Sequence, residues 1–332
     1  MFLFYNRAVL VQHSCTVRIL LTNRCYSASP VRLGALQRLN EKCEQFLEQR
    51  FPHISVLYRT LMRGFHLLFE DVKEVRRIKR VMRTSNVQFK ELPYRDMERL
   101  VLFRRDMVKA VSLLVISIPP FAIGFVFLLM CLFPRQLLFR HFWTPQQQKK
   151  YQAIDHAKRA QCHAEILKNI ISVVPSVSGW RQRTILLNLC SKVQTGTRPS
   201  LSELQAVREI FCSPPLELNS LEPGSLRSLG SQLPIMVWFP SFITRRRLVT
   251  KALELLYLDR AMKNLGLDQL SEEQKRQACD LRGLNPSDLS SGQCRDWLQQ
   301  WLQHSAQIQE TETSLFLHSM ALLTLNYPPV PE

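Results

Sequence analysis

The chain has 332 residues, of which 46% are apolar and 21% are charged. This composition allows one or two globular units with real cores and excludes a disordered tail. The formal net charge of +17 favours a negatively charged neighbour, either anionic lipid or nucleic acid, and charge alone does not choose between them.

The N-terminal residues have the composition of a transit peptide, with arginines among apolar and hydroxyl side chains and no Asp or Glu before position 41. Arg7 and Arg18 are about three helical turns apart, so a helix would present both on one side. Polar residues interrupt the apolar block that a secretory signal requires. Arg24, Tyr26 and Ser27 resemble the site that the mitochondrial processing peptidase cuts. This predicts cleavage after Tyr26 and a leader of residues 1–26.

Residues 31–109 repeat apolar side chains every three or four positions, which predicts two or three amphipathic, basic helices. The stretch holds eighteen basic and ten acidic residues, a net charge of +8. In its helix Asp71 to Arg83, apolar residues such as Val75 and Ile78 fall on one face. The other face carries Lys73, Arg76, Arg77, Lys79, Arg80 and Arg83. We interpret this basic face either as solvated or as a surface for an anionic partner.

Residues 110–133, from Ala110 to Phe133, contain no charged side chain. A helix of this length would rise roughly 36 Å, enough for a hydrocarbon core of about 30 Å, so we expect a single transmembrane helix. The alternative is a hairpin that enters the membrane and returns at Pro119 and Pro120, which precede Phe121, because each proline removes a backbone donor.

Residues 134–326 show only helical patterns, so the fold class is expected to be all-α, with a short tail at 327–332. Thr144 and Pro145 form a helix start. Further helices are predicted at Ala164–Val174, Trp180–Val193, Leu201–Phe211, Phe242–Leu265, Glu272–Arg282, Gln293–Ser305 and Thr313–Asn326. Capping boxes pair Ser200 with Glu203 and Ser271 with Gln274. Gly266 and Gly283 follow helix ends, where a left-handed residue is favoured.

Two features of the C-terminal helices stand out. Arg245, Arg246 and Arg247 are three consecutive cations near the start of the long helix, and we expect them to add to the basic binding face. Trp297 and Trp301 are four residues apart, hence on one helical face, and large aromatic residues at this spacing are usually buried in a core.

Three motifs occur in a characteristic order along the chain. They are LPYRDMERLVLFRRDMVKAV with the following IPPF and LFPRQLL at Leu92–Leu138, KVQTGTRPSLSEL at Lys192–Leu204, and LDQLSEEQKRQACDLRGL through WLQQWL at Leu267–Leu302. In these motifs the chain resembles the LETM-domain family of mitochondrial inner-membrane proteins. The resemblance implies one membrane span followed by a helical domain similar to 14-3-3 proteins, located in the inner membrane, with an outer-membrane or nuclear pool left open.

The resemblance also implies partners, namely the mitochondrial ribosome, membrane lipid such as cardiolipin, and other inner-membrane proteins. The expected function is that of a membrane-anchored binding or organising protein that supports mitochondrial structure. A role in cation/proton exchange, as in larger family members, is an alternative. Two positions argue against it, because Ile123 and Cys131 stand where the family has a glutamate and a lysine within the span, and charge inside a bilayer normally serves a function.

Other chemistry has little support in the sequence. The nine cysteines include no CxxC pair, and no GxxxxGK[ST], GxGxxG or HExxH motif occurs, so we expect no enzyme, no catalytic or metal site and no cofactor. One further alternative comes from residues 270–302, two short helices joined through Arg282, Gly283 and Leu284, which look like a SAP-type DNA-binding hairpin and would suggest a chromatin role.

Overall fold

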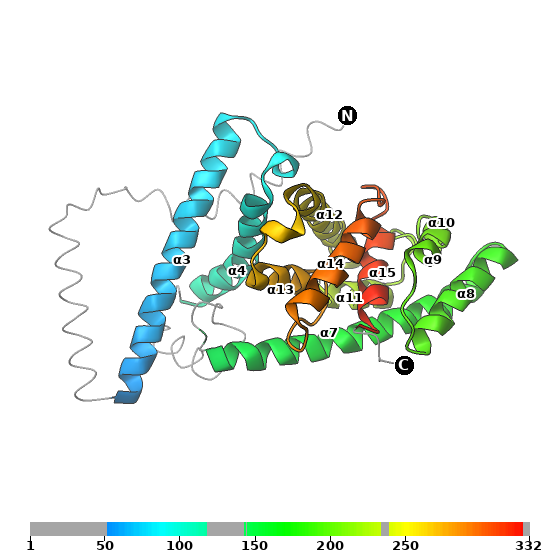
Figure 1. Ribbon diagram of the computed structural model, residues 1–332, viewed down its shortest axis with the longest axis horizontal. Helices are drawn as coiled ribbons and strands as arrows, with labels where there is room; N and C mark the ends of the chain where they lie inside the picture. The colour runs from blue at the N-terminus through cyan, green and yellow to red at the C-terminus, as the bar shows by residue number, and fades with distance from the viewer. Residues whose placement is uncertain (1–51, 118–142, 144, 234–238, 328–332) are drawn as a thin grey trace. The chain divides into compact units, whose positions relative to one another are not determined.

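The computed structural model describes residues 52–117, 143, 145–233 and 239–327, and regular structure in these ranges is entirely helical (Figure 1). The predicted all-α class is therefore confirmed for this part of the chain. The α-helices are α3 (Pro52–Thr84), α4 (Tyr94–Ser117), α7 (Pro145–Val173), α8 (Trp180–Gln194), α9 (Leu201–Ala206), α10 (Arg208–Phe211), α11 (Pro223–Ser231), α12 (Ser241–Leu265), α13 (Glu272–Leu281), α14 (Ser291–Ser305) and α15 (Thr313–Thr324). Short 3-10 turns are η1 (Phe89–Glu91), η3 (Val174–Ser176) and η4 (Leu267–Gln269).

The chain divides into two compact units, residues 1–62 and residues 63–332. The boundary falls inside α3, so the second half of this helix belongs with the elements that follow. All contacts described below lie within residues 63–332.

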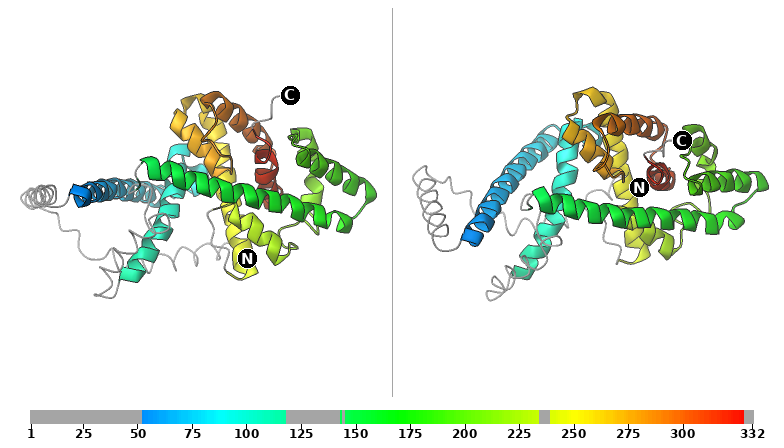
Figure 2. Two further views of the ribbon diagram at one scale, coloured as in Figure 1. Left: turned by 90° about the horizontal axis from the view of Figure 1, so that it is seen from below. Right: turned by 60° about the horizontal axis from the view of Figure 1, so that its bottom comes forward.

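Helix α15 lies at the centre of the core. Every residue from Thr313 to Thr324 is buried, so this helix needs neighbours on all sides. Helices α7, α10 and α12 supply them. The long helix α7 passes beneath α11 and α15 in Figure 1, and the turned views of Figure 2 show the same neighbourhood. It contributes Ile166 and Ile170, each 1% exposed.

Helix α12 connects the core to the N-terminal elements. It packs against α4, α11, α14 and α15, and its buried residues include Leu248, Leu255 and Met262. Both Trp297 and Trp301 of α14 are 1% exposed, and their rings stack with centroids 5.5 Å apart. The predicted core position of these two tryptophans is confirmed.

Several predicted helix ends are confirmed by local geometry. The hydroxyls of Ser200 and Ser271 accept from the backbone N–H groups of Glu203 and Gln274, as the capping boxes predict. A third box that the sequence analysis missed pairs Ser290 with Gln293 at the start of α14. Gly283 has φ +100°, and a Cβ there would lie 3.4 Å from Cε1 of His163, so both its conformation and its surroundings favour glycine.

Other boundaries differ from the prediction. Residues 52–84 form one helix of 33 residues. The helix expected to begin at Ala164 is the last third of α7, which begins at Pro145. The helix predicted at Leu201–Phe211 is interrupted at Val207. Helix α11 was missed because its sequence, PGSLRSLGS, contains residues that are typical of turns.

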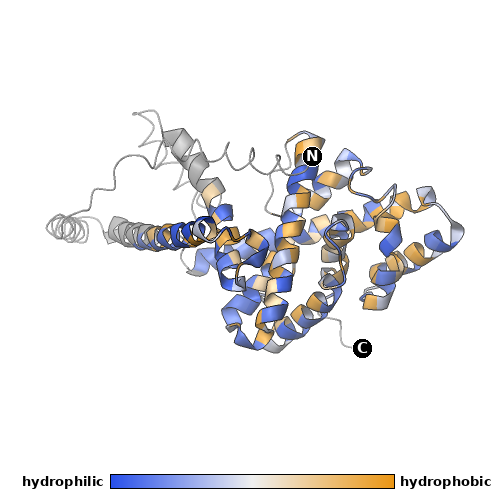
Figure 3. Ribbon diagram, turned by 90° about the horizontal axis from the view of Figure 1, so that it is seen from above, coloured by the Kyte–Doolittle hydropathy of each residue, from blue (hydrophilic) through white to orange (hydrophobic). Residues whose placement is uncertain are grey.

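The prediction of a transmembrane helix at residues 110–133 is wrong on the described part of the chain. Ala110 lies inside α4, which begins at Tyr94 and carries eight charged residues before its last turns. No helix in the described ranges combines the length and the apolar character that a bilayer crossing requires. Hydrophilic and hydrophobic residues alternate along the coloured helices of Figure 3. The other residues named for the span, Pro119, Pro120, Phe121 and Phe133, lie outside the described residues.

The predicted leader also lies outside the described residues, including Arg24, Tyr26 and Ser27. The proposed border between residues 109 and 110 falls within α4. The structure therefore does not test the division of the N-terminal third into leader, basic helices and span.

Candidate anion-binding interface

The basic face predicted on α3 is exposed. Its cations Lys73, Arg76, Arg77, Lys79, Arg80 and Arg83 are all exposed residues. Val75 and Ile78, on the opposite side, are 4% and 2% exposed and pack into the core. Burial of these two residues fixes the rotation of the helix and turns the cations outward.

One of these cations is partly neutralised. Arg77 donates to Glu74 on the same helix, with an Nη2 to Oε1 distance of 2.6 Å, and Arg99 of α4 reaches the same oxygen at 2.7 Å. The side-chain hydrogen bond from Arg77 holds the pKa of Glu74 below its ordinary value. The remaining arginines of the face and Lys73 make no ion pair with a described residue.

The three consecutive arginines of α12 have separate surroundings. Arg245 is half-buried and donates from Nη2 to the backbone carbonyl of Leu221 at 2.9 Å. Arg247 is exposed and lies over the ring of Phe239, 4.1 Å from its centroid. Arg246 is exposed as well. Arg245 therefore joins α12 to the segment before α11, and Arg246 and Arg247 face solvent.

The structure adds two cations that the sequence analysis did not single out. Arg104 of α4 and Lys251 of α12 both pair with the buried carboxylate of Glu254, the latter at 2.7 Å. Burial and the nearby guanidinium groups of Arg104 and Arg105 lower the pKa of Lys251 to about 8. The sequence could have indicated the pair of Lys251 and Glu254, because these residues are three apart on a predicted helix. It could not have indicated Arg104, which is 150 residues from Glu254.

A second ion pair is completely buried and holds α12 to α13. Arg282 and Asp259 are 0% and 1% exposed, and Nε of Arg282 donates to Oδ1 of Asp259 at 2.7 Å. Trp301 of α14 donates to the other carboxylate oxygen at 2.8 Å. Because Arg282 points into the core, the turn between α13 and α14 does not present the cation on which the SAP-like interpretation depended.

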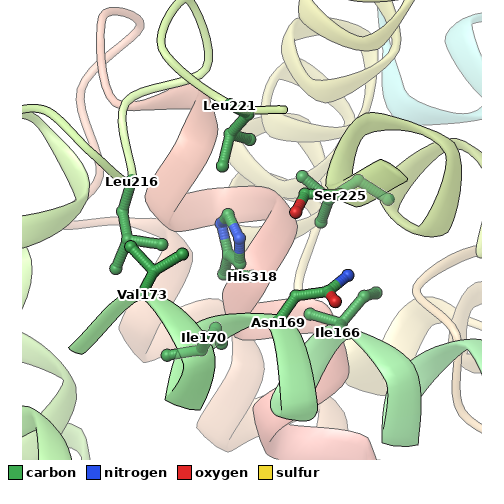
Figure 4. A pocket seen from close by; sticks show the side chains of 9 residues that line it. Ile166, Asn169, Ile170, Val173, Leu216, Leu221, Ser225 and His318 are labelled. Atoms are coloured by element: carbon green, nitrogen blue, oxygen red, sulfur yellow. The ribbon is translucent and has the colours of Figure 1, made fainter. Parts of the chain in front are cut away.

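The interior offers little room for a small molecule beside α15. A cavity of about 10 Å³ lies between α7, α11 and α15, with His318 among Asn169, Ile170, Leu216 and Leu221 (Figure 4). Nδ1 of His318 is 2.8 Å from the carbonyl of Ser314, and burial lowers the pKa of this histidine to about 4. The cavity is about the size of one water molecule. Because burial lowers its pKa, His318 is a neutral core residue.

Comparison with known proteins shows to which family the chain belongs. A family model described as "LETM1-like, RBD" matches residues 92–322, which include α4 through most of α15. LETM1 domain-containing protein 1 of Xenopus tropicalis is 44% identical over 288 residues, covering 87% of this chain and 82% of the relative. Proteins of the same name from Homo sapiens and Bos taurus are each 44% identical over 289 residues, covering 87% of this chain and 80% of the relative.

Proposed function

The chain belongs to the LETM1-domain family, and from this premise we propose that it is a non-enzymatic mitochondrial binding protein that contacts the mitochondrial ribosome through the basic face of α3. The family model, described as "LETM1-like, RBD", is that of a ribosome-binding domain and matches residues 92–322. The basic face of α3 precedes these residues, so the choice of this face rests on its exposed charge. Ribosomal RNA presents a dense array of phosphates, which exposed arginine and lysine side chains bind with release of counterions.

The observation that supports this proposal is the uncompensated charge on α3. Lys73, Arg76, Arg80 and Arg83 are exposed over three turns of one helix and make no ion pair with a described residue. A face that served only for solubility would gain from mixed charges, because like charges on adjacent turns repel one another. An external polyanion removes this repulsion.

The mitochondrial location rests on the arginine-containing leader. Cleavage after Tyr26 would remove residues 1–26 and leave the basic face of α3 in the mature protein. N-terminal sequencing of the protein purified from mitochondria is expected to begin at Ser27, and an intact Met1 would contradict the leader.

The ribosome contact can be tested by co-sedimentation of the full chain with purified mitochondrial ribosomes at rising salt concentration. Neutralising Lys73, Arg76, Arg80 and Arg83 to Gln removes four charges. If each contacts a phosphate, the slope of log affinity against log salt falls by about 3 to 4, and at about 0.15 M salt the affinity falls at least tenfold.

The matched control neutralises four other exposed cations, Lys149, Lys150, Lys158 and Arg181, which lie on α7 and α8. This control has the same net charge as the α3 variant and should keep most of the affinity. Equal losses in both variants would mean that binding depends on net charge alone. Cardiolipin vesicles form a second arm, and an α3 variant that loses vesicle binding but keeps ribosome binding would overturn the proposal.

A further inference from the structure

A second cavity lies between the C-terminal ends of α12 and α14, two helices that pack against each other (Figure 1). Its volume is about 150 Å³, similar to that of protein cavities that bind benzene. It is therefore large enough for a small organic ligand, unlike the cavity beside His318. The polar residues of its wall and the small residue at its edge are Asp259, Arg260, Lys263 and Asn264 of α12, with Ser305 and Ala306 at the end of α14.

The wall of this cavity contains a buried hydroxyl group without a hydrogen bond. Ser305 is 1% exposed, and its Oγ makes no hydrogen bond with a described residue. Ser305 acts on the pKa of Asp259 at longer range, whereas the two oxygens of this carboxylate accept shorter bonds, from Arg282 at 2.7 Å and from Trp301 at 2.8 Å. Buried polar groups are nearly always hydrogen-bonded, so the Ser305 hydroxyl indicates a place for a ligand atom.

The charged groups around the cavity leave one positive charge uncompensated. Asp259 is balanced by Arg282, and Arg260 is balanced by Glu310, with Nη1 2.9 Å from Oε1. Lys263 also lines the cavity, is exposed, and makes no ion pair with a described residue. A ligand with one negative charge would therefore make the site neutral.

The donors and the helix ends select the kind of anion. Lys263, Asn264 and Ser305 all carry hydrogen-bond donors, so the ligand has to supply acceptor oxygens. Both helices end at the cavity, and the C-terminal end of a helix carries partial negative charge. This disfavours a phosphate group, which has more than one negative charge and is typically bound at helix N-termini. Leu302 and Ala306 offer apolar contact for a short carbon chain.

We propose that this cavity binds a small monocarboxylate. Lys263 and Ser305 hold the carboxylate group, and Leu302 and Ala306 contact the carbon chain. The cavity contains no residue of α3, so this inference goes beyond the proposed function and does not depend on it.

Butyrate, whose size matches the cavity, is a suitable probe. We expect its titration into the full chain, at constant ionic strength, to shift the backbone amide NMR signals at the ends of α12 and α14. Binding should saturate with a dissociation constant of about 1 mM, which is typical of so small a ligand. A titration that does not saturate by about 50 mM would mean that the cavity holds water only, and it would overturn the proposal.

Two further probes test the kind of ligand. Butyramide has the shape of butyrate without its charge and should bind about tenfold more weakly, because it loses the charge-assisted hydrogen bond to Lys263. Inorganic phosphate should also bind about tenfold more weakly, because its additional charge faces two helix C-termini. Equal or tighter binding of either probe would contradict a monocarboxylate site.

Variants at Lys263 and Ser305 test the residues that hold the carboxylate. Lys263→Gln should weaken butyrate binding about fivefold or more, and Ser305→Ala about threefold or more. Lys168→Gln is the matched control, because Lys168 is an exposed lysine of α7 outside the cavity. Equal butyrate affinity of the Lys263 and Lys168 variants would overturn the proposed site.

Ala306 allows the cavity to be blocked without a change in the core. Ala306 is exposed, so the larger side chain of Ala306→Leu can enter the cavity from the surface. Butyrate binding should be lost while the urea midpoint stays unchanged. Ala157→Leu, at an exposed alanine of α7, is the control and should bind butyrate normally. Butyrate binding that is equally strong in both variants would show that the ligand binds elsewhere.

The outcomes separate this inference from the ribosome contact. The variant with the neutralised α3 face should bind butyrate normally, and Ala306→Leu should still co-sediment with ribosomes. If butyrate does not bind while the α3 variant loses the ribosome, the monocarboxylate site is wrong and the proposed function stands. If butyrate binds as expected while the α3 variant keeps the ribosome, the site stands and the α3 contact is wrong.

Discussion

The basic face of α3 and the ion pair between Asp259 and Arg282 use the same residue type in opposite ways. Arg76 and Arg80 are exposed and make no ion pair with a described residue, whereas Arg282 is 0% exposed and donates to a carboxylate. Each arginine lies on or next to a predicted helix. The difference arises from what lies opposite, since Arg282 faces a buried acid and the arginines of α3 face solvent. The arginines of α3 form the proposed binding face, whereas Arg282 holds α12 to the turn after α13.

The largest effect that would sharpen this comparison is expected from Asp259→Asn. It leaves Arg282 as an unpaired buried charge, and loss of one partner of a buried ion pair costs about 3–5 kcal/mol. Urea unfolding measures this change in the free energy of unfolding. Glu273→Gln, at an exposed acid of α13, is the control and should have little effect. Adding Arg282→Met to Asp259→Asn should recover part of the loss, and a cost no larger than that of the control would show that the pair contributes little.

The pH dependence of stability gives a similar comparison, between buried and exposed histidines. Burial lowers the pKa values of His304 and His318 to about 4, below the ordinary value of 6.5, so both are neutral in the folded protein. Stability is therefore complete above pH 6.5 and decreases as the pH falls towards 4, because the unfolded chain takes up the protons. The expected loss over this range is about 3 kcal/mol for each histidine.

This pH dependence can be measured as the urea midpoint at pH 7.5 and at pH 4.5. His304→Gln should reduce the difference between the two midpoints, even though it lowers stability at pH 7.5 by removing the contact with Ser319. His66→Gln, at an exposed position of α3, should leave the difference unchanged. An unchanged difference in the His304 variant would contradict the assignment.

The smallest expected effect concerns two positions of the apolar stripe of α3, one buried and one exposed. Ile78→Val removes one methyl group from a side chain that is 2% exposed, and it should cost about 1 kcal/mol. Val81 continues the same apolar stripe but is 46% exposed, so Val81→Ala should shift the urea midpoint less. If both changes cost the same, the buried stripe extends further along α3 than the structure indicates.

Helix α3 shows how far the helical period predicts structure. The period correctly identified Val75 and Ile78 as the inner side and the cations as the outer side. It did not predict the exposure of Val81, because spacing within one helix says nothing about where the neighbouring elements end. Likewise, the third capping box could have been predicted from the spacing of Ser290 and Gln293, because this pattern is local to the start of α14.

The error at residues 110–133 has a different cause. The absence of charge was counted along the sequence, and the helix was assumed to begin where the charges stop. In the structure α4 begins at Tyr94, and its charged turns make contacts with other helices, including Arg104 with Glu254 and Arg105 with Asp280. The uncharged stretch therefore did not indicate where the helix begins.

By itself, the sequence determined the helical class, most helix ends, the exposed side of α3 and membership of the LETM1-domain family, because these depend on local spacing and on ordered motifs. Only the tertiary structure decided which charged side chains form buried ion pairs and which are exposed to solvent. Asp259 and Arg282 are 23 residues apart, and Arg104 and Glu254 are 150 apart. Whether such a cation binds an outside phosphate or an inside carboxylate depends on how distant helices pack, and no local pattern contains that information.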